Sequence, residues 1–157
     1  MKNRLLTVVI FLFCVQIFAQ NNLKKISYAN LEIEVPQNYD SESEFEISSD
    51  IFKANWKYLP EETLKENYQI FFERTEGNTD IQILEKVSFL SSGATLNGKK
   101  YYLKHGVEIK ANNKFHYEIV AYGIVNNQPL VLTMYFKNNP KLNSDLDKLM
   151  KIFILFK

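Results

Sequence analysis

The fold is decided by residues 99–136, KKYYLKHGVEIKANNKFHYEIVAYGIVNNQPLVLTMYF. Three runs rich in aromatic and β-branched residues are separated here by Asn112-Asn113 and Asn126-Asn127, pairs that tolerate positive φ and favour tight hairpins. The runs predict antiparallel strands at Lys99–Lys110, Phe115–Val125 and Leu130–Phe136. Because large apolar side chains alternate onto both sides of these strands, both faces of the sheet need to be covered.

Further strand signals extend the sheet towards the N-terminus. A strand at Ile81–Leu90 is expected to join the central three through a turn at Asn97-Gly98. Four shorter strands come earlier, at Ile26–Tyr28, Leu31–Val35, Phe45–Ile47 and Phe52–Tyr58. The last of these places Phe52, Ala54, Trp56 and Tyr58 on one face.

Two helices are expected to cover this sheet. The first begins at Pro60-Glu61-Glu62, carries the apolar stripe Leu64, Tyr68, Phe71 and Phe72, and ends at Gly77-Asn78. The second follows Pro140 and carries Leu146, Leu149, Met150 and Phe153 on one side. The predicted fold class is therefore α+β, a twisted antiparallel sheet flanked by helices. A cystatin-like helix-on-sheet fold is the alternative.

The order of these elements resembles a known family. The features that carry the resemblance are Val35-Pro36 after a short strand, Pro60-Glu61-Glu62-Thr63-Leu64 at a helix start, Leu96-Asn97-Gly98-Lys99 as a hairpin, and a terminal helix leading into residues 152–157. The chain is similar to proteins of the PsbP-like or Mog-type fold, which includes DcrB-like bacterial periplasmic proteins. The resemblance implies an α/β/α sandwich and binding or scaffolding roles, and it supplies no catalytic motif to transfer.

The N-terminus has the pattern of a secretory signal peptide. A basic start with Lys2 and Arg4 is followed by an uncharged apolar run over residues 5–19, which is short for a stable membrane span. We expect cleavage after Ala19, which leaves residues 20–157 as a single domain in the periplasm or outside the cell. A retained signal anchor is the alternative. Cys14 would leave with the signal, and because apolar residues continue after it, lipidation of this cysteine is not expected.

Composition limits the classes of partner. Without Lys2 and Arg4 the chain has 17 basic and 18 acidic residues, a net charge of −1, and its one arginine is Arg74. Nucleic-acid binders usually carry a basic excess, and arginine is the usual residue for binding phosphate. A protein partner is therefore expected, with no nucleic acid, no cofactor and no membrane span after cleavage.

The residues that could carry catalysis or bind a metal are two histidines, an acidic series and two groups of serines. His105 and His116 are the two histidines, and the predicted strand pairing keeps them too far apart to share a metal ion. The acidic series Glu42, Glu44, Glu46 and Asp50 lacks the spacing of a calcium loop and is interpreted as a solvated strand face. The serines of Ser48-Ser49-Asp50 and Ser91-Ser92-Gly93 are interpreted as turn residues, without a nucleophile elbow.

The hypothesis from sequence is an exported, non-enzymatic binding or accessory protein of the bacterial envelope. Trp56, Tyr102 and Tyr122 are candidates for its partner surface, with core packing as the alternative role for each. Two other functions stay open: a carrier of a small apolar ligand held between helix and sheet, and a hydrolase whose site is assembled from distant residues.

Overall fold

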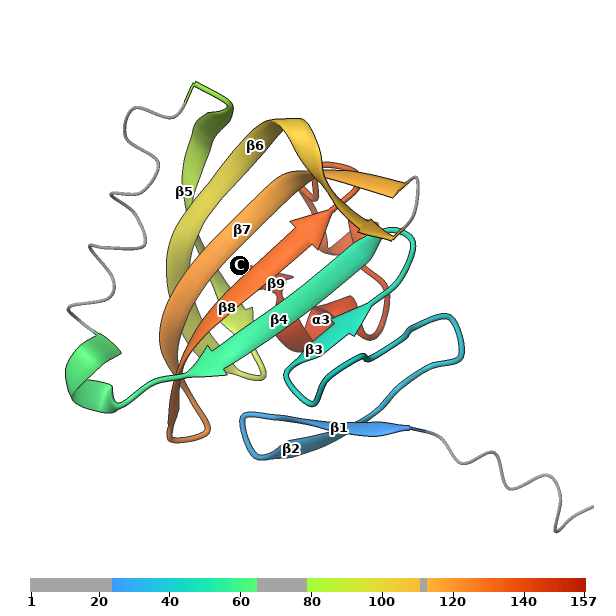
Figure 1. Cartoon of the computed structure of the whole chain (residues 1–157). Helices are drawn as coiled ribbons and strands as arrows, with labels where there is room; N and C mark the ends of the chain where they lie inside the picture. Colours follow the sequence, from blue (N-terminus) through green and yellow to red (C-terminus); the bar gives the residue numbers. More distant parts are fainter. Residues whose placement is uncertain (1–23, 65–78, 111–112) are drawn as a thin grey trace, which may run out of the picture.

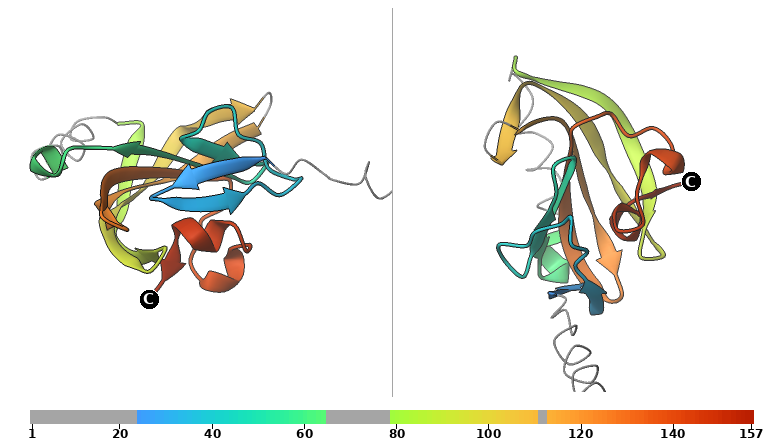
Figure 2. Two further views of the ribbon diagram at one scale, coloured as in Figure 1. Left: turned by 90° about the horizontal axis from the view of Figure 1, so that it is seen from below. Right: turned by 90° about the vertical axis from the view of Figure 1, so that its right-hand side faces the viewer.

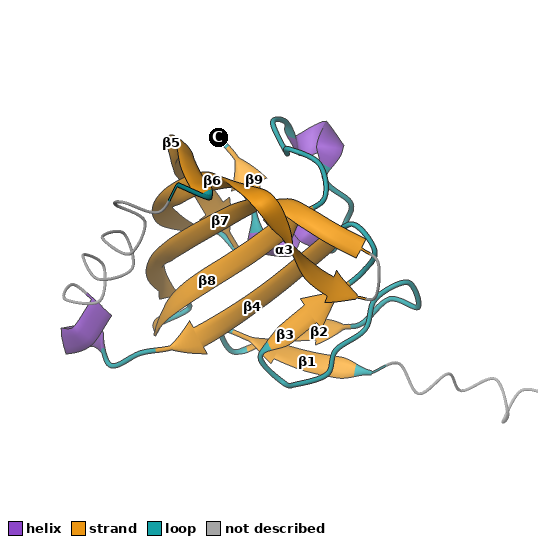
Figure 3. Cartoon of the chain, turned by 45° about the horizontal axis from the view of Figure 1, so that its top comes forward, coloured by secondary structure: helices purple, strands orange, loops and turns teal. Residues whose placement is uncertain are grey.

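The computed structural model describes residues 24–64, 79–110 and 113–157. Its strands are β1 (Lys25–Tyr28), β2 (Leu31–Glu34), β3 (Glu46–Ser48), β4 (Phe52–Tyr58), β5 (Ile81–Ser91), β6 (Ala94–Lys110), β7 (Asn113–Val125), β8 (Gln128–Phe136) and β9 (Leu155–Phe156). The C-terminal region adds the 3₁₀ turn η1 (Asn143–Asp145) and the four-residue helix α3 (Met150–Phe153). Strands therefore dominate the described part of the chain, as the orange ribbons of Figure 3 show.

Seven strands form one antiparallel sheet in the order β3-β4-β8-β7-β6-β5-β9, and β1 and β2 form a separate hairpin. The large sheet curls into a half-barrel (Figure 1). Register shifts between Ile83 and Glu85 and between Tyr102 and Val107 interrupt the pairing of β5, β6 and β7. Because such irregularities bend strands and increase their twist, they let the long strands curve.

The concave face of the sheet holds the main core. Phe153 of α3 packs there against Tyr28, Phe52 and Trp56, with ring centroids 4.8, 6.1 and 5.6 Å apart. In Figures 1 and 2 the red C-terminal segment lies on this side of the sheet, next to the blue β1–β2 hairpin. The short helix and the hairpin thus close the concave face. A smaller cluster around Tyr101 and Leu103 lies apart from this core.

The predicted α/β/α sandwich is wrong for the described residues, and so is the helix-on-sheet alternative, because no helix of seven or more residues occurs in them. The second predicted helix breaks at Leu146, whose φ of −108° and ψ of 133° are extended. Leu146, Leu149, Met150 and Phe153 are all buried as expected, but from a 3₁₀ turn and one helical turn. A curled sheet needs only this short cover on its concave face. Of the first predicted helix, residues 61–64 are helical and residues 65–78 lie outside the described ranges.

The strand predictions agree with the structure, and one turn prediction does not. Asn97-Gly98 lies inside β6, and the β5–β6 turn falls instead at Ser92-Gly93, whose φ values are 47° and 85°. At Gly98 an added Cβ would stand 2.1 Å from the carbonyl oxygen of Val120, so this glycine serves close strand packing. The Asn126-Asn127 turn is confirmed, with φ of 46° and 63°. Asn112, like the predicted signal segment, lies outside the described residues.

Candidate functional site

The three aromatic residues proposed from sequence lie in different places. Trp56 is 3% exposed and belongs to the main core, and its indole Nε1 has no hydrogen-bond partner among the described residues. In the sheet register Trp56 lies opposite Leu132 of β8, and Tyr122 lies opposite Val131. Since neighbouring residues of a strand point to opposite faces, Tyr122 lies on the convex face, away from Trp56. Tyr102 is half-buried beside the rings of His116 and Tyr117. These residues do not form one surface.

The two histidines make separate contacts. The His105 side chain is 71% exposed and its Nε2 lies 3.3 Å from Asp80 Oδ1. The Nδ1 atom of His116 lies 3.0 Å from the carbonyl oxygen of Leu103. Since a carbonyl only accepts, this nitrogen carries the proton and donates. In the described ranges no group of three or more histidine, cysteine or acidic side chains could hold a metal ion.

The acidic series is spread over a loop and a strand. Glu46 in β3 pairs with Lys53 in β4 at 2.9 Å, while Glu42, Glu44 and Asp50 are exposed. Ser91 is fully buried, and its hydroxyl lies 2.7 Å from the hydroxyl of Tyr28. This serine helps to fix the β1–β2 hairpin to β5.

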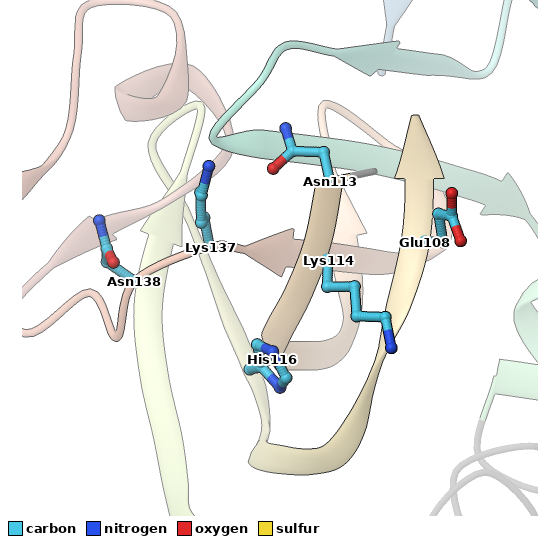
Figure 4. A pocket seen from close by; sticks show the side chains of 6 residues that line it. All are labelled: Glu108, Asn113, Lys114, His116, Lys137 and Asn138. Atoms are coloured by element: carbon cyan, nitrogen blue, oxygen red, sulfur yellow. The ribbon is translucent and has the colours of Figure 1, made fainter. Parts of the chain in front are cut away.

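A polar cleft of about 610 Å³ lies where β6, β7 and the end of β8 meet. Its lining residues are Glu108, Asn113, Lys114, His116, Lys137 and Asn138 (Figure 4). In Figure 4 Glu108 and His116 lie on opposite sides of Lys114, and the Lys137 ammonium points away from both. The six lining residues include no hydroxyl or thiol, and their charged groups do not converge on one point.

A second cavity, of about 400 Å³, lies between β2 and the C-terminal segment. One wall is residues 32–36 of β2 and the chain after it, and the other is formed by Lys148, Leu149 and Ile152. Ile33, Val35 and Leu149 are at least 95% buried and give this groove an apolar floor. Glu32, Glu34 and Lys148 are exposed and form its charged rim. We call this cavity the β2–α3 groove.

Both walls of the groove are fixed by tertiary contacts. The backbone N–H of Ala29 donates to Tyr58 Oη at 2.8 Å, and the Asn126 side-chain amide donates to the Ala29 carbonyl at 2.9 Å. On the other wall, Asp147 accepts from the Met150 N–H at 2.8 Å and from the Tyr39 hydroxyl at 2.6 Å. Burial, together with this carboxylate, raises the pKa of Tyr39, so its hydroxyl stays protonated and continues to donate.

The outer edge of β2 is open towards the groove. The β1–β2 turn, with Ala29 at φ 47° and Asn30 at φ 65°, makes Tyr28 and Leu31 the first hydrogen-bonded pair of the hairpin. Antiparallel pairs alternate, so the N–H and C=O groups of Glu32 and Glu34 point away from β1. No described residue forms a hydrogen bond to these backbone groups.

The rim charges of the groove are unequally paired. The ammonium of Lys25 donates a hydrogen bond to Glu32, and this contact raises the pKa of Lys25. Glu34 is exposed beside the open edge and forms no ion pair with a described residue, although Lys25 lies opposite it in the hairpin and its charge also acts on Glu34. The Glu34 carboxylate is therefore available to an incoming positive charge.

Sequence reasoning identified the elements of the groove and missed the groove itself. The alternation Leu31-Glu32-Ile33-Glu34-Val35 indicated a half-buried strand, and Leu149 was assigned to a helix stripe. Only the fold brings these two segments together.

No family model matches the chain, and no curated protein matches it. A search of the described residues finds no helix that is both long enough and apolar enough to cross a membrane.

Proposed function

We propose that this protein is an exported, non-enzymatic accessory protein of the bacterial cell envelope that binds a polypeptide partner in the β2–α3 groove. The observation that carries the proposal is an apolar groove of about 400 Å³, one wall of which is an open strand edge. The signal-peptide pattern of residues 1–19 supports export. The family resemblance drawn from the element order stays a prediction beside it.

A polypeptide suits this groove because it supplies two kinds of contact at once. Its backbone can satisfy the outward N–H and C=O groups of Glu32 and Glu34, and its apolar side chains can cover Leu149 and Ile152. Since these walls are held by hydrogen bonds within the protein, little ordering of the site is needed on binding.

Site-directed photocrosslinking in the native envelope tests this function. A benzoylphenylalanine at position 152, in the groove, is expected to give one dominant protein adduct. The matched control places the same probe at Ile83, which is 42% exposed on β5. The same adducts from both positions, or none from position 152, would contradict the proposal.

The volume of the groove also favours a second candidate, a carrier of a small apolar ligand, because such ligands occupy cavities of about 300–1,000 Å³. Native mass spectrometry of the protein purified from its own envelope separates the two functions. A bound small molecule of constant mass, lost in an Ile152→Asp variant, would favour the carrier over the polypeptide binder.

A further inference from the structure

We propose that the partner of the β2–α3 groove binds as an extended strand added to the free edge of β2, with apolar and basic side chains alternating along it. This inference rests on the proposed function and specifies how the groove would be used. It follows from three features of the described residues: the open backbone edge, the alternation of side chains along β2, and the exposed carboxylate of Glu34, which forms no ion pair.

The backbone groups of the β2 edge match an incoming strand. Glu32 and Glu34 are two positions apart, about 7 Å at strand rise, so their outward N–H and C=O groups present the repeat of a β ladder. The edge is short, because Pro36 has no N–H and its carbonyl accepts from the Tyr39 N–H at 2.9 Å. A partner segment of about four to five residues would therefore fill it.

The side chains of β2 define the partner's pattern. Ile33 and Val35 point into the apolar floor, and Glu32 and Glu34 alternate with them and lie at the exposed rim of the groove. In paired strands, side chains that lie opposite each other share one face. The apolar residues of an added strand would therefore lie on the side of Ile152, and the residues between them would lie beside the glutamates. Because Glu34 has no described ion-pair partner, a lysine or arginine opposite it is the complementary residue.

The edges of the seven-stranded sheet are less suited to strand addition. At β3 the edge is bridged by Asp40, whose N–H donates to Ser48 at 2.7 Å. At β5 the strand β9 covers Phe89 and Leu90, and a bulge interrupts the ladder between Ile83 and Glu85. Bulges, and short strands or loops that cover the edge, commonly protect a sheet from pairing with another chain. The edge of β2 has neither.

The test measures amide hydrogen exchange by NMR on the ¹⁵N-labelled chain without its signal segment. In the free protein the amides of Glu32 and Glu34 are expected to exchange at least tenfold faster than those of Ile33 and Val35. The probe is a seven-residue peptide of alternating lysine and valine with blocked ends. Saturating peptide is expected to slow exchange at Glu32 and Glu34 at least tenfold, whereas a glutamate and valine peptide is not.

Alternate N-methylation of the peptide isolates the backbone contribution. Strand addition uses only every second N–H of the peptide, so methylating one alternate set is expected to weaken binding at least tenfold and methylating the other less than threefold. Equal tolerance of both sets, or no slowing of exchange at Glu32 and Glu34, would overturn the inference.

Variants of Glu34 separate backbone from charge. Glu34→Pro removes an outward N–H that the hairpin does not use and is expected to weaken binding at least tenfold. Glu34→Gln keeps the N–H and is expected to weaken binding two- to fivefold. If the proline variant does not fold, the glutamine variant still tests the contribution of the charge. The control Glu44→Gln, at an exposed acid outside the groove, should leave binding unchanged. Equal binding by wild type and both Glu34 variants would also overturn strand addition.

Failure of this inference can be told apart from failure of the proposed function. If the position 152 probe captures a partner but the exchange of Glu32 and Glu34 stays fast, the groove binds a polypeptide in another way. If position 152 captures no partner, the proposed function itself fails.

Discussion

Lys100 is a buried cation whose removal gives a quantitative test of the packing at the concave face. It is 3% exposed, and its Nζ donates to the carbonyl oxygen of Pro140 at 2.9 Å and pairs with Glu85 at 2.8 Å. The ammonium also lies 5.6 Å from the ring centroid of Phe156. Lys100 thus ties the C-terminal segment to β5 and β6. Lys100→Met keeps most of the apolar stem and removes all three polar contacts.

The carbonyl left without a donor decides the sign of the expected change in stability. A hydrogen bond from a charged donor contributes about 1.5–3 kcal/mol, and a cation over an aromatic ring about 0.5–2 kcal/mol. The Glu85 side chain is 56% exposed, so its ion pair adds only about 0.2–1 kcal/mol. Desolvation of the ammonium opposes these terms by several kcal/mol. We expect a net loss of about 2 kcal/mol, because the buried Pro140 carbonyl is left without a donor.

The free energy of unfolding is measured by urea denaturation, with the fluorescence of Trp56 as the signal. A loss of about 2 kcal/mol corresponds to a fall in Tm of about 4–8 °C for a chain of this size. The exposed control Lys86→Met should change stability by less than about 0.5 kcal/mol, and Glu85→Gln by less than about 1 kcal/mol. If Lys100→Met were as stable as the wild type, the cost of burying the ammonium would equal what its contacts contribute, and the reasoning would be refuted.

Three further substitutions test the fold. Phe153→Ala should lower the free energy of unfolding by about 3–5 kcal/mol in urea, because its fully buried ring joins three other aromatic rings; a cost below about 1 kcal/mol would contradict its place in the core. Gly98→Ala should destabilise more than Gly93→Ala, because a methyl at Gly98 would meet the backbone of Val120, whereas at Gly93 it meets no atom of the described residues and costs only the strain of φ 85°; the reverse order of Tm values would contradict the close packing at Gly98. Burial raises the pKa of Glu118 in the folded protein above its unfolded value of 4.5. The resulting stabilisation is fully present below pH 4.5, where Glu118 is protonated, and is lost as the pH rises through the folded pKa. Glu118→Gln should therefore raise Tm at pH 7 and have less effect below pH 4, and an equal effect at both would exclude this titration.

The strands could be predicted because their signal is local. Alternation over residues 52–58 fixes β4 with the same bounds that the structure has, and Asn126-Asn127 fixes the β7–β8 turn. The spacing of Leu146, Leu149, Met150 and Phe153 predicts burial correctly. It does not distinguish one long helix from a 3₁₀ turn followed by a single helical turn, since both place these residues on one side.

Long-range packing explains the failures. Asn97-Gly98 is a strong local hairpin signal, yet Val120 on the neighbouring strand needs the space that Gly98 leaves, and the turn forms at Ser92-Gly93 instead. The role of Trp56 was open for a similar reason. Its strand face was predictable, but the cover of that face by Phe153 depends on a segment from the far end of the chain. The β2–α3 groove shares this origin and has no local signature.

The rigidity of the groove sets the affinity to expect from it. Residues 20–157 contain no cysteine, so the β1–β2 hairpin is held by contacts such as Tyr28 with Ser91 and Ala29 with Tyr58 rather than by a disulfide. The site is thus formed before binding, and the cost of ordering falls on the partner, at about 1–2 kcal/mol for each residue fixed. With only about four to five residues paired, that cost offsets much of the gain from the backbone hydrogen bonds and the apolar floor. Strand addition at this edge should therefore be weak and reversible.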